Sequence, residues 1–118
     1  MLPEMIIALT IYYEAGNQGP QGQEMVASVI SQRSENSGRT PEYECRKRKQ
    51  FSCWNKGTPP IPQDSTAWRN CRFLATHLPK GNGYTHYHTT QVLPYWAKNA
   101  SDSYLVGSHL FYKKEWLA

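Results

Sequence analysis

Residues 2–15 read Leu-Pro-Glu-Met-Ile-Ile-Ala-Leu-Thr-Ile-Tyr-Tyr-Glu-Ala, and Gly16 follows them. Pro3 suits the first turn of a helix, where its missing N–H costs no hydrogen bond. Apolar side chains then recur at helical spacing, at Met5, Ile6, Leu9, Tyr12 and Tyr13. Gly16 is a typical C-cap. The stretch therefore predicts a helix over 2–15, with Glu14 in its last turn.

Two more helices are predicted further along the chain. An apolar stripe indicates one over about 23–33. Another, clearly amphipathic, is expected from a cap at Asp64 or Ser65 to about Leu78. The stretches expected to lack regular structure are a polar loop over 34–41 and an irregular, proline-containing segment over 42–63.

Two short strands are predicted in the last third of the chain. Residues 85–89 alternate as a strand does, and 105–112 offer a second strand with Gly107 inside it. Paired, they would form a short antiparallel hairpin. These elements predict a small, mainly helical α+β fold, and 118 residues suit a single domain over 1–118.

Charge and hydropathy narrow the function classes. The formal net charge is +4, which favours polyanionic partners such as nucleic acid, anionic lipid or the bacterial cell wall. No apolar run approaches the roughly 20 residues that span a bilayer, so stable membrane insertion is not expected. Glu4 interrupts the N-terminal stretch and no basic segment precedes it, so we expect no signal peptide.

The three cysteines are Cys45, Cys53 and Cys71. An odd count leaves at least one unpaired in a monomer, and one disulfide would have three alternative pairings. Reduced, structural thiols are the other reading. Their spacing does not match a zinc finger or ribbon.

Glu14 is the first candidate for chemistry. The negative end of the helix dipole and the flanking tyrosines, Tyr12 and Tyr13, both disfavour a charged carboxylate there. A carboxylic acid that stays protonated near neutral pH is what a glycosidase needs to protonate a leaving group. The alternative is a solvated glutamate at a frayed helix end.

The segment Thr85-His86-Tyr87-His88 is the second candidate. On a strand, His86 and His88 point to one face and Tyr87 to the other. With His109 from a neighbouring strand the two histidines could bind zinc. They could equally bind sugar in a cleft or form structural hydrogen bonds.

Three other stretches have weaker signals. Residues 50–55, which include Ser52 and Trp54, mix aromatic, hydroxyl and amide groups as sugar-binding loops do. Aromatic residues at 94–97 would line a cleft or fill the core. The basic run 46–49 would be solvated, assist adhesion to an anionic wall or bind nucleic acid.

Taken together, these motifs resemble the SleB-type cell wall hydrolases, the family of the spore cortex-lytic enzymes. The matching blocks, in order, are TIYYEA at 10–15 with GQEMVASVISQR at 22–33, QFSCWN at 50–55, THYH at 85–88 with Val92, Pro94, Trp96 and Ala97, and VGSHLFY at 106–112. The sequence departs from the family pattern beside the acid, where Tyr13 replaces a glycine and Gly16 follows Ala15 directly. Gln32 also stands where the family usually has asparagine.

The resemblance implies a lysozyme-like fold and cleavage of peptidoglycan glycan strands by a lytic transglycosylase or a muramidase. It maps the catalytic glutamate to Glu14 and places Ser52, His86 and Tyr87 in the cleft. Trp54, His88 and Tyr12 are further predicted substrate contacts. No cofactor or metal is expected, and we expect a monomer that binds peptidoglycan and not nucleic acid.

The absence of a signal peptide and the basic surface favour a phage endolysin or virion lysin, held in the host cytoplasm and acting on the wall after release. Three alternatives remain at this point. They are a zinc amidase using His86, His88 and His109, a wall-binding module without catalysis, and a nucleic-acid binder using residues 46–49.

Overall fold

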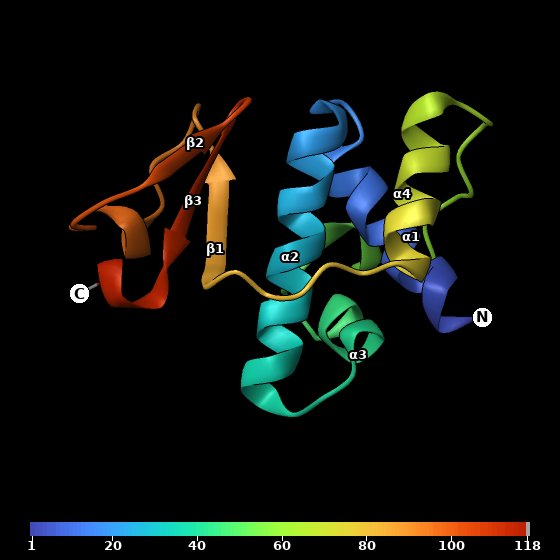
Figure 1. The fold of residues 1–118 in the computed structure, drawn as a ribbon, viewed down its shortest axis with the longest axis horizontal. Helices are drawn as coiled ribbons and strands as arrows, with labels where there is room; N and C mark the ends of the chain where they lie inside the picture. Colours follow the sequence, from blue (N-terminus) through green and yellow to red (C-terminus); the bar gives the residue numbers. More distant parts are fainter. Residues whose placement is uncertain (118) are drawn as a thin grey trace.

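The computed structural model describes residues 1–117 and has two parts, a group of helices and a small sheet. Within these residues the helices are α1 (Pro3–Ala15), α2 (Gly19–Ser37), α3 (Pro41–Arg46) and α4 (Thr66–Thr76). The strands are β1 (Tyr84–Thr89), β2 (Tyr104–Val106) and β3 (His109–Lys113), and single 3-10 turns lie at η1 (Ser52–Trp54), η2 (Tyr95–Ala97) and η3 (Lys114–Trp116). Figure 1 shows the sheet on one side of α2 and the other three helices on its other side. The predicted mainly helical α+β class is confirmed.

Helix α1 forms the centre of the core. Six consecutive residues, 6–11, are buried, which means that the helix is covered on nearly all sides by α2, α3 and α4. Leu9 and Ile11 are fully buried, and Val26 and Val29 of α2 pack into the same cluster. Pro3 lies in the first turn and Gly16 caps the end, as the sequence predicts. The core therefore fixes the helix that carries Glu14.

Helix α2 is longer than the predicted 23–33 at both ends. Pro20 is tolerated in its first turn, and Gly38, with φ of 73°, ends it in the left-handed conformation that glycine adopts easily. The predicted loop over 34–41 is wrong for residues 34–37, which form a last, polar turn facing solvent. The contacts of this turn are polar, so it has no apolar signal in the sequence.

The sequence predicts an irregular segment over 42–63. This prediction is wrong for residues 42–46, which belong to helix α3. Thr40 caps α3 by accepting a hydrogen bond from the Tyr43 N–H at 3.1 Å, and Pro41 occupies the first helical position. Six residues are too few to show a helical period. The third predicted helix is α4, capped by Ser65 as expected, but it ends at Thr76 rather than Leu78.

The sheet has the strand order β1-β3-β2, and both pairs are antiparallel. The prediction of one strand over 105–112 is wrong, because the chain reverses at Gly107 and Ser108 and forms two strands. Gly107 has φ of 60°, so it begins a tight hairpin turn instead of lying inside a strand. The predicted pairing with residues 85–89 holds for β3 alone.

The structure bears on the expectations for membrane insertion and for the cysteines. Within residues 1–117 no helix has the length and apolar character to cross a bilayer. Cys45, Cys53 and Cys71 are all free thiols, and burial raises the pKa of Cys45 and of Cys71 to about 12. These two buried cysteines act as core side chains.

Candidate active site

Glu14 lies at the end of α1 and is partly buried. The phenol hydroxyl of Tyr87 on β1 donates a hydrogen bond to Oε1 of Glu14. Burial raises the pKa of Glu14 above its ordinary value of 4.5, while the Tyr87 hydrogen bond and then the charge of Arg33 act against that rise. The net direction is upward, so the carboxyl keeps its proton to a higher pH than a solvated glutamate does.

The neighbours of Glu14 differ from those expected from the sequence. Tyr12 packs edge-to-face on Trp68 of α4, with ring centroids 5.7 Å apart. The hydroxyl of Tyr13 donates to the carbonyl of Pro60 at 2.6 Å. Neither adjacent tyrosine bonds the carboxyl. Tyr12 therefore lies toward the helical core, and Tyr87 is the tyrosine at the acid.

Tyr87 is held on the face of β1 that packs toward the helices. Its ring lies 5.3 Å from the ring of Phe111, its partner on β3, and 5.2 Å from that of His109. Burial, and next the charge of Glu14, raise the pKa of Tyr87 well above 10.0. Tyr87 therefore stays a neutral hydrogen-bond donor toward Glu14 throughout the physiological pH range.

Arg33 connects α2 to the sheet and to the loop before η1. Its Nε donates to the carbonyl of Thr85 at 2.9 Å, and its Nη1 donates to Oε1 of Gln50 at 3.2 Å. The guanidinium also lies over the ring of Phe51, 5.3 Å from the centroid. Sequence reasoning did not single out Arg33. The signal was present, because it follows Ile30 at helical spacing and so belongs to the buried face of α2.

His86 and His88 share the other face of β1, as predicted. Both imidazole rings contact Trp96, with ring centroids 5.1 Å apart for His86 and 5.6 Å apart for His88. His88 is buried, with Nε2 hydrogen-bonded to the Tyr112 hydroxyl and Nδ1 to the carbonyl of Thr89, both at 2.7 Å. Its ring nitrogens are therefore occupied within the fold. His86 is more accessible, and burial followed by the charge of Arg33 lowers its pKa.

The three histidines of the zinc alternative do not converge. His109 pairs with Thr89, and residues directly opposite each other in an antiparallel pair share a face, so His109 lies on the face of Tyr87. His86 and His88 lie on the opposite face. Within residues 1–117 no three His, Cys, Asp or Glu side chains gather as a metal site would require. This geometry does not support a zinc amidase.

The loop 50–55 runs beside the end of α1. Trp54 donates from Nε1 to Oγ1 of Thr10 at 2.9 Å, one helical turn before Glu14. Cys53 is close enough for the charge of Glu14 to add to the burial that raises its pKa to about 11. Ser52 is exposed at the start of η1. Of the residues predicted here, Trp54 is anchored to the core through Thr10, and Ser52 is exposed to solvent.

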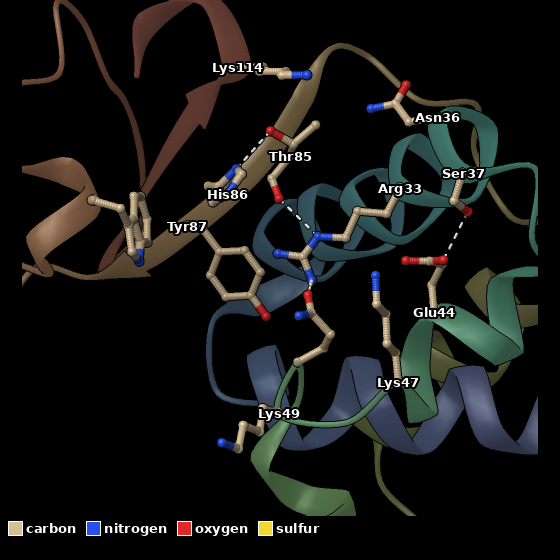
Figure 2. A pocket seen from close by; sticks show the side chains of 12 residues that line it. Arg33, Asn36, Ser37, Glu44, Lys47, Lys49, Thr85, His86, Tyr87 and Lys114 are labelled. Carbon is tan, nitrogen blue, oxygen red and sulfur yellow. Dashed lines mark hydrogen bonds between the residues drawn. The ribbon is translucent and has the colours of Figure 1, made fainter. Parts of the chain in front are cut away.

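A groove, called the central groove below, opens between α2, the chain after α3, and β1. It is lined by Arg33, Asn36, Ser37, Glu44, Lys47, Lys49, Gln50, Thr85, His86, Tyr87, Trp96 and Lys114. Figure 2 shows the Arg33 side chain in the middle of this lining, with Tyr87 on one side and Glu44 on the other. Glu14 itself does not line this groove, but Tyr87 both lines the groove and donates its hydrogen bond to Glu14, so the acid adjoins the groove through Tyr87.

A model of the family described as cell wall hydrolase matches residues 17–112, which is most of the chain. The chain belongs to the cell wall hydrolase family. Its activity is therefore cleavage of peptidoglycan, as the sequence resemblance implies at this coarser level. The match in this cell wall hydrolase begins just after Glu14 and covers Arg33, Tyr87 and the other groove residues except Lys114.

No curated protein and no solved structure matches this cell wall hydrolase. The lysozyme-like character implied by the resemblance therefore stays a prediction, while the α+β class is established. The structure brings together Glu14, Tyr87 and His86 with two groups that the sequence did not single out, Arg33 and Glu44. It places Tyr12 and His88 away from the open groove.

Proposed function

We propose that this cell wall hydrolase cuts the glycan strand at the β-1,4 bond between N-acetylmuramic acid and N-acetylglucosamine, with Glu14 as the acid. The observation behind the proposal is the environment of Glu14: a partly buried carboxyl with a raised pKa, held by a neutral phenol beside a groove. A glycosidase needs such a group, because the leaving oxygen must be protonated as the bond breaks.

In the proposed reaction the bond from C1 of the muramoyl unit to the bridging oxygen breaks, and Glu14 gives its proton to that oxygen. The resulting carboxylate then takes the proton of the muramoyl 6-hydroxyl while O6 attacks C1. The products are a free 4-hydroxyl and a 1,6-anhydro end, and Glu14 is protonated again. Tyr87 holds the carboxyl in place, and Arg33 stabilises its charged form between the two steps.

Within residues 1–117, the lack of a second accessible carboxylate beside Glu14 favours this lytic transglycosylase route over hydrolysis by a muramidase. A muramidase would need a second free carboxylate to activate water or to stabilise the cation. Glu44 is the carboxylate that lines the groove, but it is only 3% exposed and accepts a hydrogen bond from the Ser37 hydroxyl at 2.9 Å. Glu14 is the more accessible of the two, which suits one residue acting first as acid and then as base.

The test is digestion of purified peptidoglycan, with products identified by mass spectrometry. The wild type is expected to release anhydro-muropeptides, and Glu14→Gln to lose about 1,000-fold or more of the rate. Glu24→Gln, an exposed position on α2, is the matched control and should keep the wild-type rate. If the wild type instead releases products with reducing ends, and Glu44→Gln does not, the enzyme is a muramidase with Glu44 as its second carboxylate. Equal cleavage by wild type and Glu14→Gln would overturn the proposal.

A further inference from the structure

Apart from Arg33, the central groove has positive charge that the proposed reaction does not use. Its cations are Arg33 and three exposed lysines, Lys47, Lys49 and Lys114, against one carboxylate, Glu44. Within residues 1–117 the single ion pair joins Arg69 to Asp64, and neither residue lines the groove. The groove lysines therefore have no acidic partner in the fold and are available for an anionic ligand.

These cations come from both sides of the groove. Lys47 and Lys49 follow α3, and Lys114 begins η3 after the sheet. Figure 2 shows Lys114 on the side opposite Lys47, with Arg33 between them. The basic run of the sequence is thus divided, since Arg46 turns instead to the ring of Trp54, 5.6 Å from its centroid. A ligand with several negative groups could meet cations on both sides at once.

The one groove carboxylate does not cancel this charge. Glu44 is buried and occupied by Ser37, and its charge acts on Arg33, which is already held by Thr85 and Gln50. The lysines remain. Trp96 adds an apolar surface to the same groove.

We infer that the central groove binds the carboxylates carried by the lactyl arm of the muramoyl unit, while the sugar at the scissile bond lies at Glu14. The inference rests on the proposed glycan cleavage, and it concerns the substituent of the sugar that the enzyme recognises. It is carried by charge complementarity and by continuity, because Tyr87 lines the groove and also bonds the acid. In whole peptidoglycan those carboxylates belong to the stem peptide. After an amidase removes the peptide, the lactyl acid itself supplies one.

Binding is measured by NMR titration on Glu14→Gln protein, with three tetrasaccharide probes. They are a peptide-bearing muropeptide tetrasaccharide, the same compound stripped of its peptides, and neutral chitotetraose. The peptide-bearing probe is expected to bind at least fivefold more tightly than chitotetraose. The added variant Lys47→Gln/Lys114→Gln should weaken that probe about fivefold and leave chitotetraose unchanged, as expected for two solvent-exposed charge contacts.

The matched control is Arg72→Gln/Lys80→Gln, which removes two exposed positive charges outside the groove and should leave all three affinities unchanged. Equal affinities for all three probes, no binding of any probe, or an equal loss in both double variants would overturn the inference. Tighter binding of the peptide-bearing probe assigns the recognised carboxylates to the stem peptide. Equal binding of both muramoyl probes above chitotetraose assigns them to the lactyl acid.

The two proposals fail separately. Cleavage by Glu14→Gln at the wild-type rate would overturn Glu14 as the acid, while comparison of cleavage by Lys47→Gln/Lys114→Gln and by Arg72→Gln/Lys80→Gln would still test the groove. Conversely, a loss of cleavage in Glu14→Gln with no preference for carboxylate-bearing probes would keep the proposed function and remove the role of the groove.

Discussion

The Tyr87 hydroxyl on β1 donates a hydrogen bond to Glu14 at the end of α1, across 73 positions of sequence. The contact has two effects of opposite sign on the acid. Packing the sheet against the helices buries the carboxyl and raises its pKa, whereas the hydrogen bond stabilises the carboxylate and lowers it. Burial is the larger effect. The pKa of the acid is therefore adjusted by one phenol, whose hydroxyl can be removed with little change in shape.

Tyr87→Phe should move the basic limb of the pH profile of kcat/KM to higher pH. The variant loses the hydrogen bond that stabilises the carboxylate, so the pKa of Glu14 rises further and the protonated acid persists to higher pH. The profile is measured on soluble glycan strands. Tyr13→Phe is the control, because its hydroxyl bonds Pro60 and not Glu14. An unmoved or lowered basic limb in Tyr87→Phe would contradict the assignment of Glu14 as the titrating acid.

Glu14→Gln should become more stable relative to the wild type as pH rises. The folded pKa of Glu14 lies above 4.5, so between those two values the folded state binds more protons than the unfolded state. The contribution is fully present below about 4.5 and is lost as pH rises through the folded pKa, at about 1.4 kcal/mol per pH unit within the window. Urea unfolding from pH 4 to 8 measures it, with Glu24→Gln as the control. Parallel curves for wild type and Glu14→Gln would show that the carboxyl is not destabilised by burial.

The sequence predicts the elements that carry strong periodic signals. Apolar residues at helical spacing gave α1 closely, the predicted cap at Asp64 or Ser65 gave the start of α4, and alternation gave β1. It could not predict α3, or the last turn of α2, because a six-residue helix and a solvent-facing turn have no apolar period to detect.

The candidate site shows the same limit at the level of side chains. The motifs contain both Glu14 and Tyr87, but their contact depends on how β1 docks on α2. That docking is fixed by Arg33 bonding the backbone carbonyl of Thr85, a tertiary contact that no local pattern encodes. Similarly, His88 looked accessible as one of an alternating pair, yet its bond to Tyr112 occupies the ring.

Trp54→Phe should reduce the free energy of unfolding by about 1–2 kcal/mol, because it removes the indole N–H that bonds the buried Thr10 Oγ1 at 2.9 Å. The Thr10 hydroxyl still donates to the Ile6 carbonyl, so only its acceptor side is left unpaired. Urea unfolding of Trp54→Phe, Thr10→Val and the double variant measures the coupling between the two side chains. Strictly additive losses would show that the hydrogen bond does not contribute to stability.

Gly107→Ala should destabilise the protein more than Gly57→Ala does, although both glycines have positive φ, 60° and 97°. A Cβ at Gly107 would lie 2.6 Å from Oε1 of Gln18, which accepts the Ser108 N–H at 2.9 Å and so ties the β2–β3 turn to the chain between α1 and α2. A Cβ at Gly57 meets nothing within 4 Å, so that variant measures backbone strain alone, about 1 kcal/mol. The added loss in Gly107→Ala, about 1 kcal/mol for the displaced hydrogen bond, should appear as a lower Tm in thermal unfolding. Equal Tm values would mean that Gln18 moves aside without cost, and that the turn is not held against the helices through this contact.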